Sequence, residues 1–293
     1  PNPLIERVFE MGSVFKPLTM VAGFDAGVIS PETTYDDKGS VVLDGFRIHN
    51  HDKKARGTVD MQKVIDDSLN TGAIFIMQKL GRDRFRQEMH AFGLDEITGI
   101  ELPGEIKSLT SNLKSPRQVE YATVSFGQGI AVTPLALTRA FATLANGGFL
   151  VSPYIVEKIN YRDGRKELID RARPVRVLSD EATEAITQVL INAFDFSLLG
   201  GKYKMNNYSL ATKTGTAQIA QTASRGYEEG RNLHSFFVYY PAYEPRFLVF
   251  MYLVEPQGVR FASDTLVEPF VSMADFLLNY YEVPPDRGFV NNQ

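Results

Sequence analysis

The residues that could do chemistry in this sequence begin with a serine and a lysine three positions apart. Ser13 and Lys16 lie in the stretch EMGSVFKPLTMVAGF, residues 10–24. A serine hydroxyl is a weak nucleophile unless a base takes its proton, and lysine can be that base when burial and nearby positive charge lower its pKa. At i and i+3 of a helix, the two side chains share one face. The pair therefore predicts a nucleophile and its base, and the competing interpretation of Ser13 is an ordinary helix cap.

The surrounding residues place this pair at the start of a helix. Residues 15–24 have apolar side chains at helical spacing, and Pro17 fits only in a first turn because its missing N–H is harmless there. At a helix N-terminus, the dipole and the free N–H groups would stabilise a developing oxyanion near Ser13. A second Ser-x-x-Lys, Ser111 to Lys114, lies in the polar stretch LTSNLKSPR and is predicted to be a loop.

Two more motifs offer partners for the pair. Ser68-Leu69-Asn70 lies at the predicted junction of two helices in residues 59–80, and it supplies a hydroxyl for proton transfer and an amide for a peptide group. The stretch ATKTGTAQ, residues 211–218, carries a cation, hydroxyls and a glycine on a predicted strand, where glycine often marks close approach of a ligand. Each motif alone has an ordinary interpretation, as a helix break or a bulge. In the order Ser-x-x-Lys, Ser-x-Asn, Lys-Thr-Gly, they together indicate a catalytic site.

Histidine is the usual base for a serine, but the histidines of this sequence give weaker evidence for a catalytic or metal site. His49-x-His51 could attract a metal, but it lies in a polar loop, and a metal site needs further ligands and supporting groups. We therefore expect both to be surface residues and predict no metal site. No Gly-x-Ser-x-Gly turn occurs. Cysteine is absent, which excludes disulfides, thiolate metal sites and a cysteine nucleophile.

Composition narrows the class of protein. Of 293 residues, 44% are hydrophobic and 23% charged, which suits a soluble globular protein with a sizeable core. The net charge of -4, without a long basic block, argues against nucleic acid as a partner. No run of about 18 apolar residues and no signal peptide is visible. Because the chain opens abruptly on Pro1-Asn2-Pro3, we expect a fragment whose targeting segment lies upstream.

Periodicity and turn residues predict an α+β fold in one interwoven domain, with an antiparallel sheet flanked by terminal helices and a mostly helical subdomain. The runs HSFFVYYPAY and RFLVFMYLVEP, joined at Glu244-Pro245, predict a β-hairpin. Further predicted elements are a hairpin at 41–48 turning at Asp44-Gly45, helices at 133–145, 180–194 and 266–281, a strand at 209–219, and a flexible tail at 283–293.

At this point the sequence resembles the transpeptidase domain of class B penicillin-binding proteins. Ser68 follows Ser13 by 55 residues and Lys213 follows it by 200, and both spacings look typical of that class. FEMGSVFKP is similar to the family's FEPGSTFKP, with Met11 replacing the usual proline. SFGQGIAVTPLALTRAFATLANGG, residues 125–148, is a close match, and SFGQGIAVTP with LVEPQG looks slightly more like the division and sporulation group.

The resemblance extends to about residue 281 and carries expectations about the whole protein. It implies a penicillin-binding protein or serine β-lactamase-like fold over residues 1–282. It also implies two sheet strands, a pedestal domain and a transmembrane anchor upstream, none of which is in this sequence. The implied location is extracytoplasmic, in the periplasm or at the outer face of a bacterial membrane.

By resemblance, the first two motifs carry the reaction. Ser13 would be the acylated nucleophile and Lys16 its general base. Ser68 would pass the proton to the leaving group, and Asn70 would hold the side-chain amide of the substrate. Lys213 would keep the site electropositive and help to lower the pKa of Lys16.

The third motif would bind the substrate. Thr214 and Thr216, with Gly215 between them, would bind the terminal carboxylate. The backbone N–H groups of Ser13 and Thr216 would form an oxyanion hole. The strand that carries them would pair with the extended substrate, as in strand addition.

The implied reaction is acyl transfer on peptidoglycan stem peptides that end in D-Ala-D-Ala, without a cofactor. β-Lactams would acylate Ser13 stably. Implied partners are strands derived from lipid-linked precursors, a membrane glycosyltransferase, and other division or elongation proteins.

Three alternatives remain. A D,D-carboxypeptidase shares the motifs, because they do not distinguish an amine acceptor from water. A class A β-lactamase needs a Glu-x-x-Leu-Asn-type loop, whereas IELPGEIKSLTSN here has Glu101 and Glu105 without that pattern, and a class D enzyme has Ser-x-Val at the second motif. The third alternative is a non-catalytic, penicillin-sensing domain.

Overall fold

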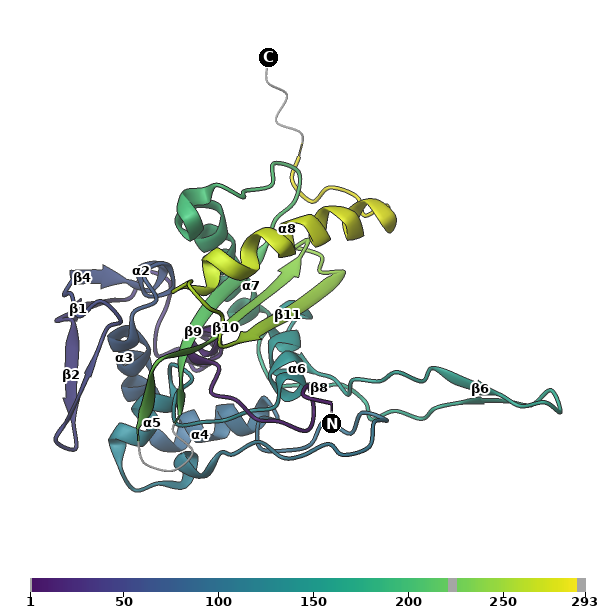
Figure 1. Cartoon of the computed structure of the whole chain (residues 1–293), viewed down its shortest axis with the longest axis horizontal. Helices are drawn as coiled ribbons and strands as arrows, with labels where there is room; N and C mark the ends of the chain where they lie inside the picture. The colour runs from purple at the N-terminus through teal and green to yellow at the C-terminus, as the bar shows by residue number, and fades with distance from the viewer. Residues whose placement is uncertain (1, 221–225, 289–293) are drawn as a thin grey trace, which may run out of the picture.

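A three-stranded antiparallel sheet lies at the centre of the molecule. The computed structural model describes residues 2–220 and 226–288, and its sheet has the order β11-β10-β9 (Figure 1). The strands are β9 (Ala211–Ala220), β10 (Tyr227–Tyr240) and β11 (Phe247–Val254). Tyr240 pairs with Phe247, so the hairpin predicted around Glu244-Pro245 is confirmed.

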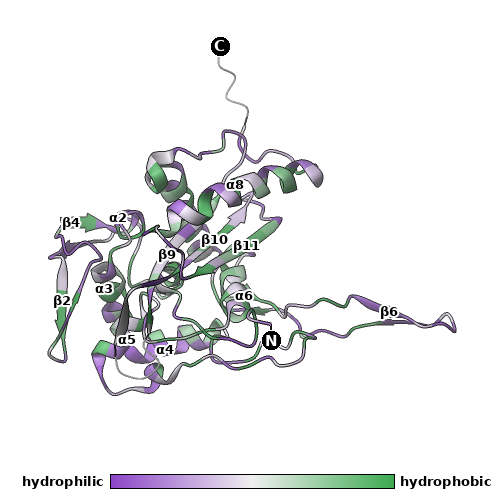
Figure 2. Cartoon of the chain, viewed as in Figure 1, coloured by the Kyte–Doolittle hydropathy of each residue, from purple (hydrophilic) through white to green (hydrophobic). Residues whose placement is uncertain are grey.

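Strand β10 is apolar on both of its faces from Phe236 to Tyr240. Phe237 and Tyr239 pack into one hydrophobic cluster, and Phe236 and Val238 pack into another. Successive side chains of a strand point to opposite sides, so the two clusters lie on opposite faces of the sheet. In Figure 2, apolar colouring is visible on β11 and on the part of β10 that lies beside it. Because both faces of the sheet carry apolar side chains, each face has to be buried against other elements.

Helices supply both covers. On one face lie α1 (Lys16–Asp25), α6 (Pro134–Ala145) and α7 (Asp180–Asn192), and on the other lies α8 (Ala262–Tyr280). The sequence sets where these helices begin. The hydroxyl of Thr133 caps α6 by accepting a hydrogen bond from the Ala136 N–H, and Ser179 caps α7 in the same way. The predicted closing helix therefore exists, and it starts at 262 rather than 266.

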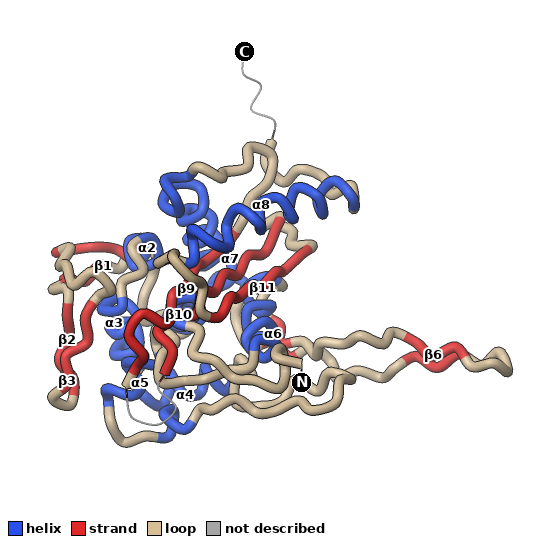
Figure 3. The backbone as a smooth tube through the Cα atoms, viewed as in Figure 1, coloured by secondary structure: helices blue, strands red, loops and turns tan. Residues whose placement is uncertain are grey.

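A mostly helical subdomain flanks the sheet, as Figure 3 shows. Its helices are α2 (Met61–Asp66), α3 (Asn70–Leu80), α4 (Arg82–Ala91) and α5 (Gln118–Val124). Short strands edge it: β1 (Thr34–Asp37) pairs with β4 (Gly57–Asp60), and β2 (Ser40–Leu43) pairs with β3 (Phe46–His49). The turn at Asp44-Gly45 is confirmed, and both residues have positive φ, as tight hairpins require.

A long two-stranded arm projects from the body (Figure 1). At its base β5 (Phe149–Leu150) pairs with β8 (Val175–Arg176), and farther out β6 (Lys158–Asn160) pairs with β7 (Lys166–Leu168). In the described residues, no helix is both long enough and apolar enough to span a membrane.

Residues 283–287, predicted to belong to a flexible tail, pack against the domain. Val283 is buried with α8, the Ser209 N–H donates to Asp286 at 2.8 Å, and Arg287 pairs with Asp195 at 2.6 Å. The prediction of a flexible tail is wrong for these residues. It rested on their polar, proline-rich composition, which does not reveal that they have partners about 80 residues away in the chain. The last five residues, 289–293, lie outside the described part.

Candidate active site

Ser13 lies in a single 3-10 turn, η1 (Gly12–Phe15), that runs directly into α1. Pro17 occupies the first turn of α1, as predicted. The Ser13 side chain caps neither element. Its Oγ instead lies within hydrogen-bond distance of Lys16 Nζ, at 3.0 Å. The capping interpretation of Ser13 is therefore wrong, and the hydroxyl faces a possible base.

Ser68 sits at the C-terminal end of α2 in a left-handed conformation, with φ of 53°. The Leu69 N–H binds the Val64 carbonyl at 2.9 Å and the Ser68 N–H binds Ile65 at 3.3 Å, the two bonds of a Schellman motif. Glycine is the usual residue at this position because other side chains are strained there. A serine here carries about 1 kcal/mol of strain. In return, the turn presents its hydroxyl beside Lys16.

Lys16 joins the two serines. Its Nζ lies 3.0 Å from Ser13 Oγ, 3.0 Å from Ser68 Oγ and 2.5 Å from the Ser68 carbonyl oxygen. The side chain is 1% exposed. A neutral amine has two N–H groups and one lone pair, and these match the three contacts: the carbonyl can only accept, so one hydroxyl accepts and the other donates. The arrangement can pass a proton between the two serines.

Burial and charge both favour the neutral amine. The pKa of Lys16 is well below its usual range, first because the side chain is buried and then because the positive charge of Lys213 is close. Burial also lowers the pKa of Lys213, to about 8. Lys213 is 6% exposed and donates to the Thr214 carbonyl at 3.0 Å. Both effects shift Lys16 toward the neutral form that a general base needs.

Asn70 begins α3, and a buried network fixes that end of the helix. Asn70 Nδ2 donates to the His49 carbonyl at 2.9 Å. Next to it, Thr71 Oγ1 donates to Asp37 at 2.8 Å, and the Thr71 N–H donates to Asn50 at 3.2 Å. Asp37 also accepts from Asn50 at 3.0 Å. Strands β1 and β3 therefore position the Ser-x-Asn turn, a role that the predicted hairpin at 41–48 did not reveal.

Gly215 has a different role from the one that a strand glycine suggested. A Cβ at this position would lie 2.5 Å from Ser235 Oγ, 2.8 Å from the Met11 carbonyl oxygen and 3.0 Å from the Val14 nitrogen. The missing side chain lets β9 approach the turn that carries Ser13, and Gly215 does not line the cavity. The close approach that the sequence predicted is to the protein's own backbone. This contact brings Thr214 and Thr216 beside Ser13.

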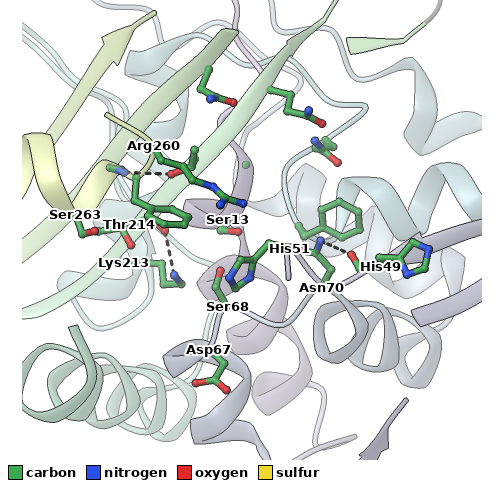
Figure 4. A pocket seen from close by; sticks show the side chains of 18 of the residues that line it. Ser13, His49, His51, Asp67, Ser68, Asn70, Lys213, Thr214, Arg260 and Ser263 are labelled. Atoms are coloured by element: carbon green, nitrogen blue, oxygen red, sulfur yellow. Dashed lines mark hydrogen bonds between the residues drawn. The ribbon is translucent and has the colours of Figure 1, made fainter. Parts of the chain in front are cut away.

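One cavity of about 940 Å³ gathers the predicted residues. Its lining includes Ser13, Ser68, Asn70, Lys213, Thr214 and Thr216. Figure 4 shows the first five of these side chains around a common space. Lys16 lies beneath this surface, covered by the residues it contacts. Residues from three distant parts of the chain therefore meet at one site.

The cavity also includes residues that the sequence did not single out as functional. His51 lines it and packs edge-on against Phe261 from the opposite side, with ring centroids 6.5 Å apart. Arg260 points into it from the sheet side (Figure 4). The expectation that His51 is only a surface residue is incomplete, because the side chain is exposed to the cavity. No local pattern marks Arg260 or Phe261, which reach the site only because α8 begins there.

The second Ser-x-x-Lys lies away from the cavity. Ser111 and Lys114 form a 3-10 turn, η2 (Ser111–Lys114), rather than the predicted loop, and both are exposed. The glutamates considered for a β-lactamase are also engaged elsewhere. Glu105 accepts from Thr98 and Gly99, and Glu101 accepts from the Ile155 N–H at 3.0 Å. Neither lines the cavity.

The fold and the site define a serine acyl-transfer domain of the penicillin-binding class. The family model for the penicillin binding protein transpeptidase domain matches residues 1–273. The chain therefore belongs to this family.

Named relatives agree with this assignment. Stage V sporulation protein D of Bacillus subtilis is 29% identical over 92% of this chain and 42% of its own length. PbpB, a penicillin-binding protein of Mycolicibacterium smegmatis, is 27% identical over 98% of this chain and 46% of its length. Peptidoglycan D,D-transpeptidase MrdA of Acinetobacter baumannii is 29% identical over 85% of this chain and 40% of its own length. The chain spans about half the length of the curated relatives it matches.

Solved structures share the fold. Penicillin binding protein 3 of Mycobacterium tuberculosis, complexed with aztreonam, superposes with a TM-score of 0.89 at 26% identity, over 97% of this chain and 65% of that one. The transpeptidase domain of penicillin-binding protein 3 from Burkholderia pseudomallei superposes with a TM-score of 0.83 at 26% identity, over 97% of this chain and 83% of that one. The predicted α+β, penicillin-binding fold is confirmed.

Proposed function

We propose that this chain is the catalytic domain of a peptidoglycan D,D-transpeptidase. The observation that carries the proposal is the position of Lys16 Nζ, buried and 3.0 Å from both Ser13 Oγ and Ser68 Oγ. Relatives named as peptidoglycan D,D-transpeptidases support the substrate class. The domain would act where peptidoglycan is built, outside the cytoplasm.

The reaction runs in two halves. Ser13 Oγ attacks the carbonyl carbon of the penultimate D-alanine while Lys16 takes the hydroxyl proton. The C–N bond then breaks, the terminal D-alanine leaves with a proton passed through Ser68, and an ester to Ser13 remains. In the second half, an amine of a neighbouring stem attacks this ester, the C–O bond breaks, and the Ser13 hydroxyl regains its proton.

The remaining residues bind and orient the donor. Asn70 binds the side-chain amide of the stem, and Thr214 and Thr216 bind the terminal carboxylate, next to Gly215, which keeps the strand close to the nucleophile. The backbone N–H groups of Ser13 and Thr216 stabilise the oxyanion; loss of one such donor costs roughly 3–4 kcal/mol in other acyl-transfer enzymes. Strand β9 is an edge strand within the described sheet, so it can pair with an extended substrate.

The same site should react with β-lactams, since these mimic the donor. Incubation with a fluorescent penicillin is expected to label the protein, and Ser13→Ala is expected to abolish labelling. Ser111→Ala is the matched control and should label like the parent. Intact mass with peptide mapping should place the adduct on Ser13. Labelling that survives Ser13→Ala and disappears in Ser111→Ala would overturn the assignment.

Turnover assays distinguish a transpeptidase from a carboxypeptidase, a β-lactamase and a sensing domain. A thioester donor with an added amine should yield the amide in a transpeptidase, whereas a carboxypeptidase yields only the hydrolysed acid. Rapid hydrolysis of the penicillin would favour a β-lactamase. Labelling without any turnover would favour a sensing domain.

An N-terminal membrane anchor, a glycosyltransferase partner and division, sporulation or elongation proteins belong to the proposal through the family resemblance. The names of the relatives, which include a sporulation protein and MrdA, support the wider class rather than one of these roles.

A further inference from the structure

A buried histidine lies behind the substrate-binding strand. His234 is on β10, fully buried, and it is paired in register with Thr216 on β9. Cross-strand partners in a sheet point to the same face, so His234 and Thr216 both face α8. No step of the proposed reaction uses His234.

The imidazole connects three elements. Its Nε2 lies 3.2 Å from the Arg260 carbonyl oxygen, just before α8, and its Nδ1 lies 2.9 Å from Thr265 Oγ1, in the first turn of α8. Burial lowers the pKa of His234, which favours the neutral ring. Because a carbonyl can only accept, Nε2 carries the proton and Nδ1 accepts from Thr265. The Thr265 hydroxyl has one proton, and Nδ1 is closer to it than the Ala262 carbonyl oxygen at 3.2 Å.

The same segment holds the hydroxyl of Thr216. The Ala262 N–H donates to Thr216 Oγ1 at 3.2 Å. No other hydrogen bond of this hydroxyl is found within residues 2–220 and 226–288. Because the hydroxyl oxygen already accepts from Ala262, its own proton remains available for donation to a ligand. A carboxylate only accepts, so this orientation suits it. Residues 260–262 are thus tied to β10 by His234 and to β9 by Thr216.

We propose that His234 is a positioning residue for acylation of Ser13. It holds residues 260–262 against the sheet, so that the Ala262 N–H fixes the Thr216 hydroxyl as a donor and the Arg260 side chain remains at the cavity. The inference rests on the proposed function, because it concerns binding of the donor carboxylate.

Three substitutions separate the two contacts of the imidazole. His234→Gln places an amide N–H near the position of Nε2 and can still reach the Arg260 carbonyl. His234→Asn reaches only the position of Nδ1, and His234→Leu removes both contacts. The matched control is Thr187→Val, which removes a buried hydrogen bond of 2.7 Å to Tyr239 on the same strand, far along β10 from the site.

Acylation by a fluorescent penicillin is the first measurement. Leu and Asn at position 234 should lower the second-order rate by about 10- to 100-fold, as expected when a buried hydrogen bond is lost. The loss should appear mainly in the half-saturating concentration, because the carboxylate is bound before and during the reaction. Gln should restore the rate to within about 3-fold of the parent. A Gln variant no faster than the Asn variant, or a Thr187→Val variant that loses as much activity, overturns the proposal.

Hydrogen exchange of the segment 256–263 gives a readout that needs no activity. Exchange should rise in the Leu and Asn variants and stay near the parent level in the Gln variant. If the parent protein is not labelled by penicillin at all, the proposed function fails, and exchange still decides whether His234 holds this segment. Unchanged exchange in the Leu variant contradicts the proposal whatever the labelling shows.

Discussion

The charge of one buried lysine decides whether the candidate site can react. In the proposed reaction Lys16 must lose a proton to activate Ser13, and its burial and the nearby charge of Lys213 both lower its pKa. Lys213 has to stay protonated to exert this effect, and its own pKa is about 8. The two lysines therefore have opposite requirements. The useful pH range lies between the two pKa values.

This predicts a bell-shaped dependence of acylation rate on pH. The rate should rise as Lys16 loses its proton and fall above about pH 8 as Lys213 loses its own. In Lys213→Met, the remaining amine should hold its proton more tightly, so the rising limb moves to higher pH and the falling limb disappears. Rates of penicillin acylation across the pH range test this. Lys114→Met, at the exposed second motif, is the control, and an unmoved rising limb in Lys213→Met would contradict the mechanism.

At the scale of elements, the ends of helices and strands present the reactive groups. The Schellman motif that ends α2 holds Ser68 in a left-handed conformation, and η1 brings Ser13 to the start of α1. Strand β9 approaches η1 because Gly215 leaves room for it. Stability and chemistry conflict at Ser68, since glycine would suit the backbone better and would lack the hydroxyl.

Ser68→Gly is therefore expected to raise stability and lower activity. Relief of the left-handed strain should increase the free energy of unfolding by about 1 kcal/mol relative to Ser68→Ala, which keeps the strain. Both variants should lose about 10²- to 10⁴-fold in turnover, the usual contribution of a proton-transfer group. Thermal unfolding and thioester turnover measure the two effects. A Gly variant less stable than the Ala variant would show that the backbone at Ser68 is not strained.

At the scale of the molecule, residues 283–287 pack against the hydrophobic cluster that lies between the sheet and α8. Asp195 is 7% exposed, and its carboxylate pairs with Arg287 at 2.6 Å and Lys204 at 3.6 Å. Asp286 also binds both the N–H and the hydroxyl of Ser209, just before β9. Residues 283–287 therefore help to hold the strand that carries the third motif.

Arg287→Met should destabilise the domain without changing the site. Removing one partner of a largely buried ion pair leaves a poorly compensated carboxylate, so we expect a loss of about 2 kcal/mol, which lowers the melting temperature by roughly 4–8 °C. Arg165→Met is the control, because its pair with Asp163 is exposed on the arm and should contribute little. Penicillin labelling at room temperature should persist in both variants. Equal melting temperatures for the two would show that the C-terminal contact contributes nothing.

The sequence by itself determined the features that depend on neighbouring residues. Pro17 marked the start of α1, Asp44-Gly45 marked a hairpin turn, and the runs around Glu244-Pro245 paired as predicted. Motif order and spacing indicated the family, which the match to the transpeptidase domain over residues 1–273 confirms. These features are local because capping, turn geometry and periodicity act over a few residues.

Only the tertiary structure decided which distant groups meet. The contact of Lys16 with Ser68 spans 52 residues, and that of Ser235 with Met11 spans 224. The depressed pKa of Lys16, the true reason for Gly215 and the position of His234 all depend on what packs around them. Burial and long-range hydrogen bonds leave no periodic signal in the chain, so no local pattern could have predicted them.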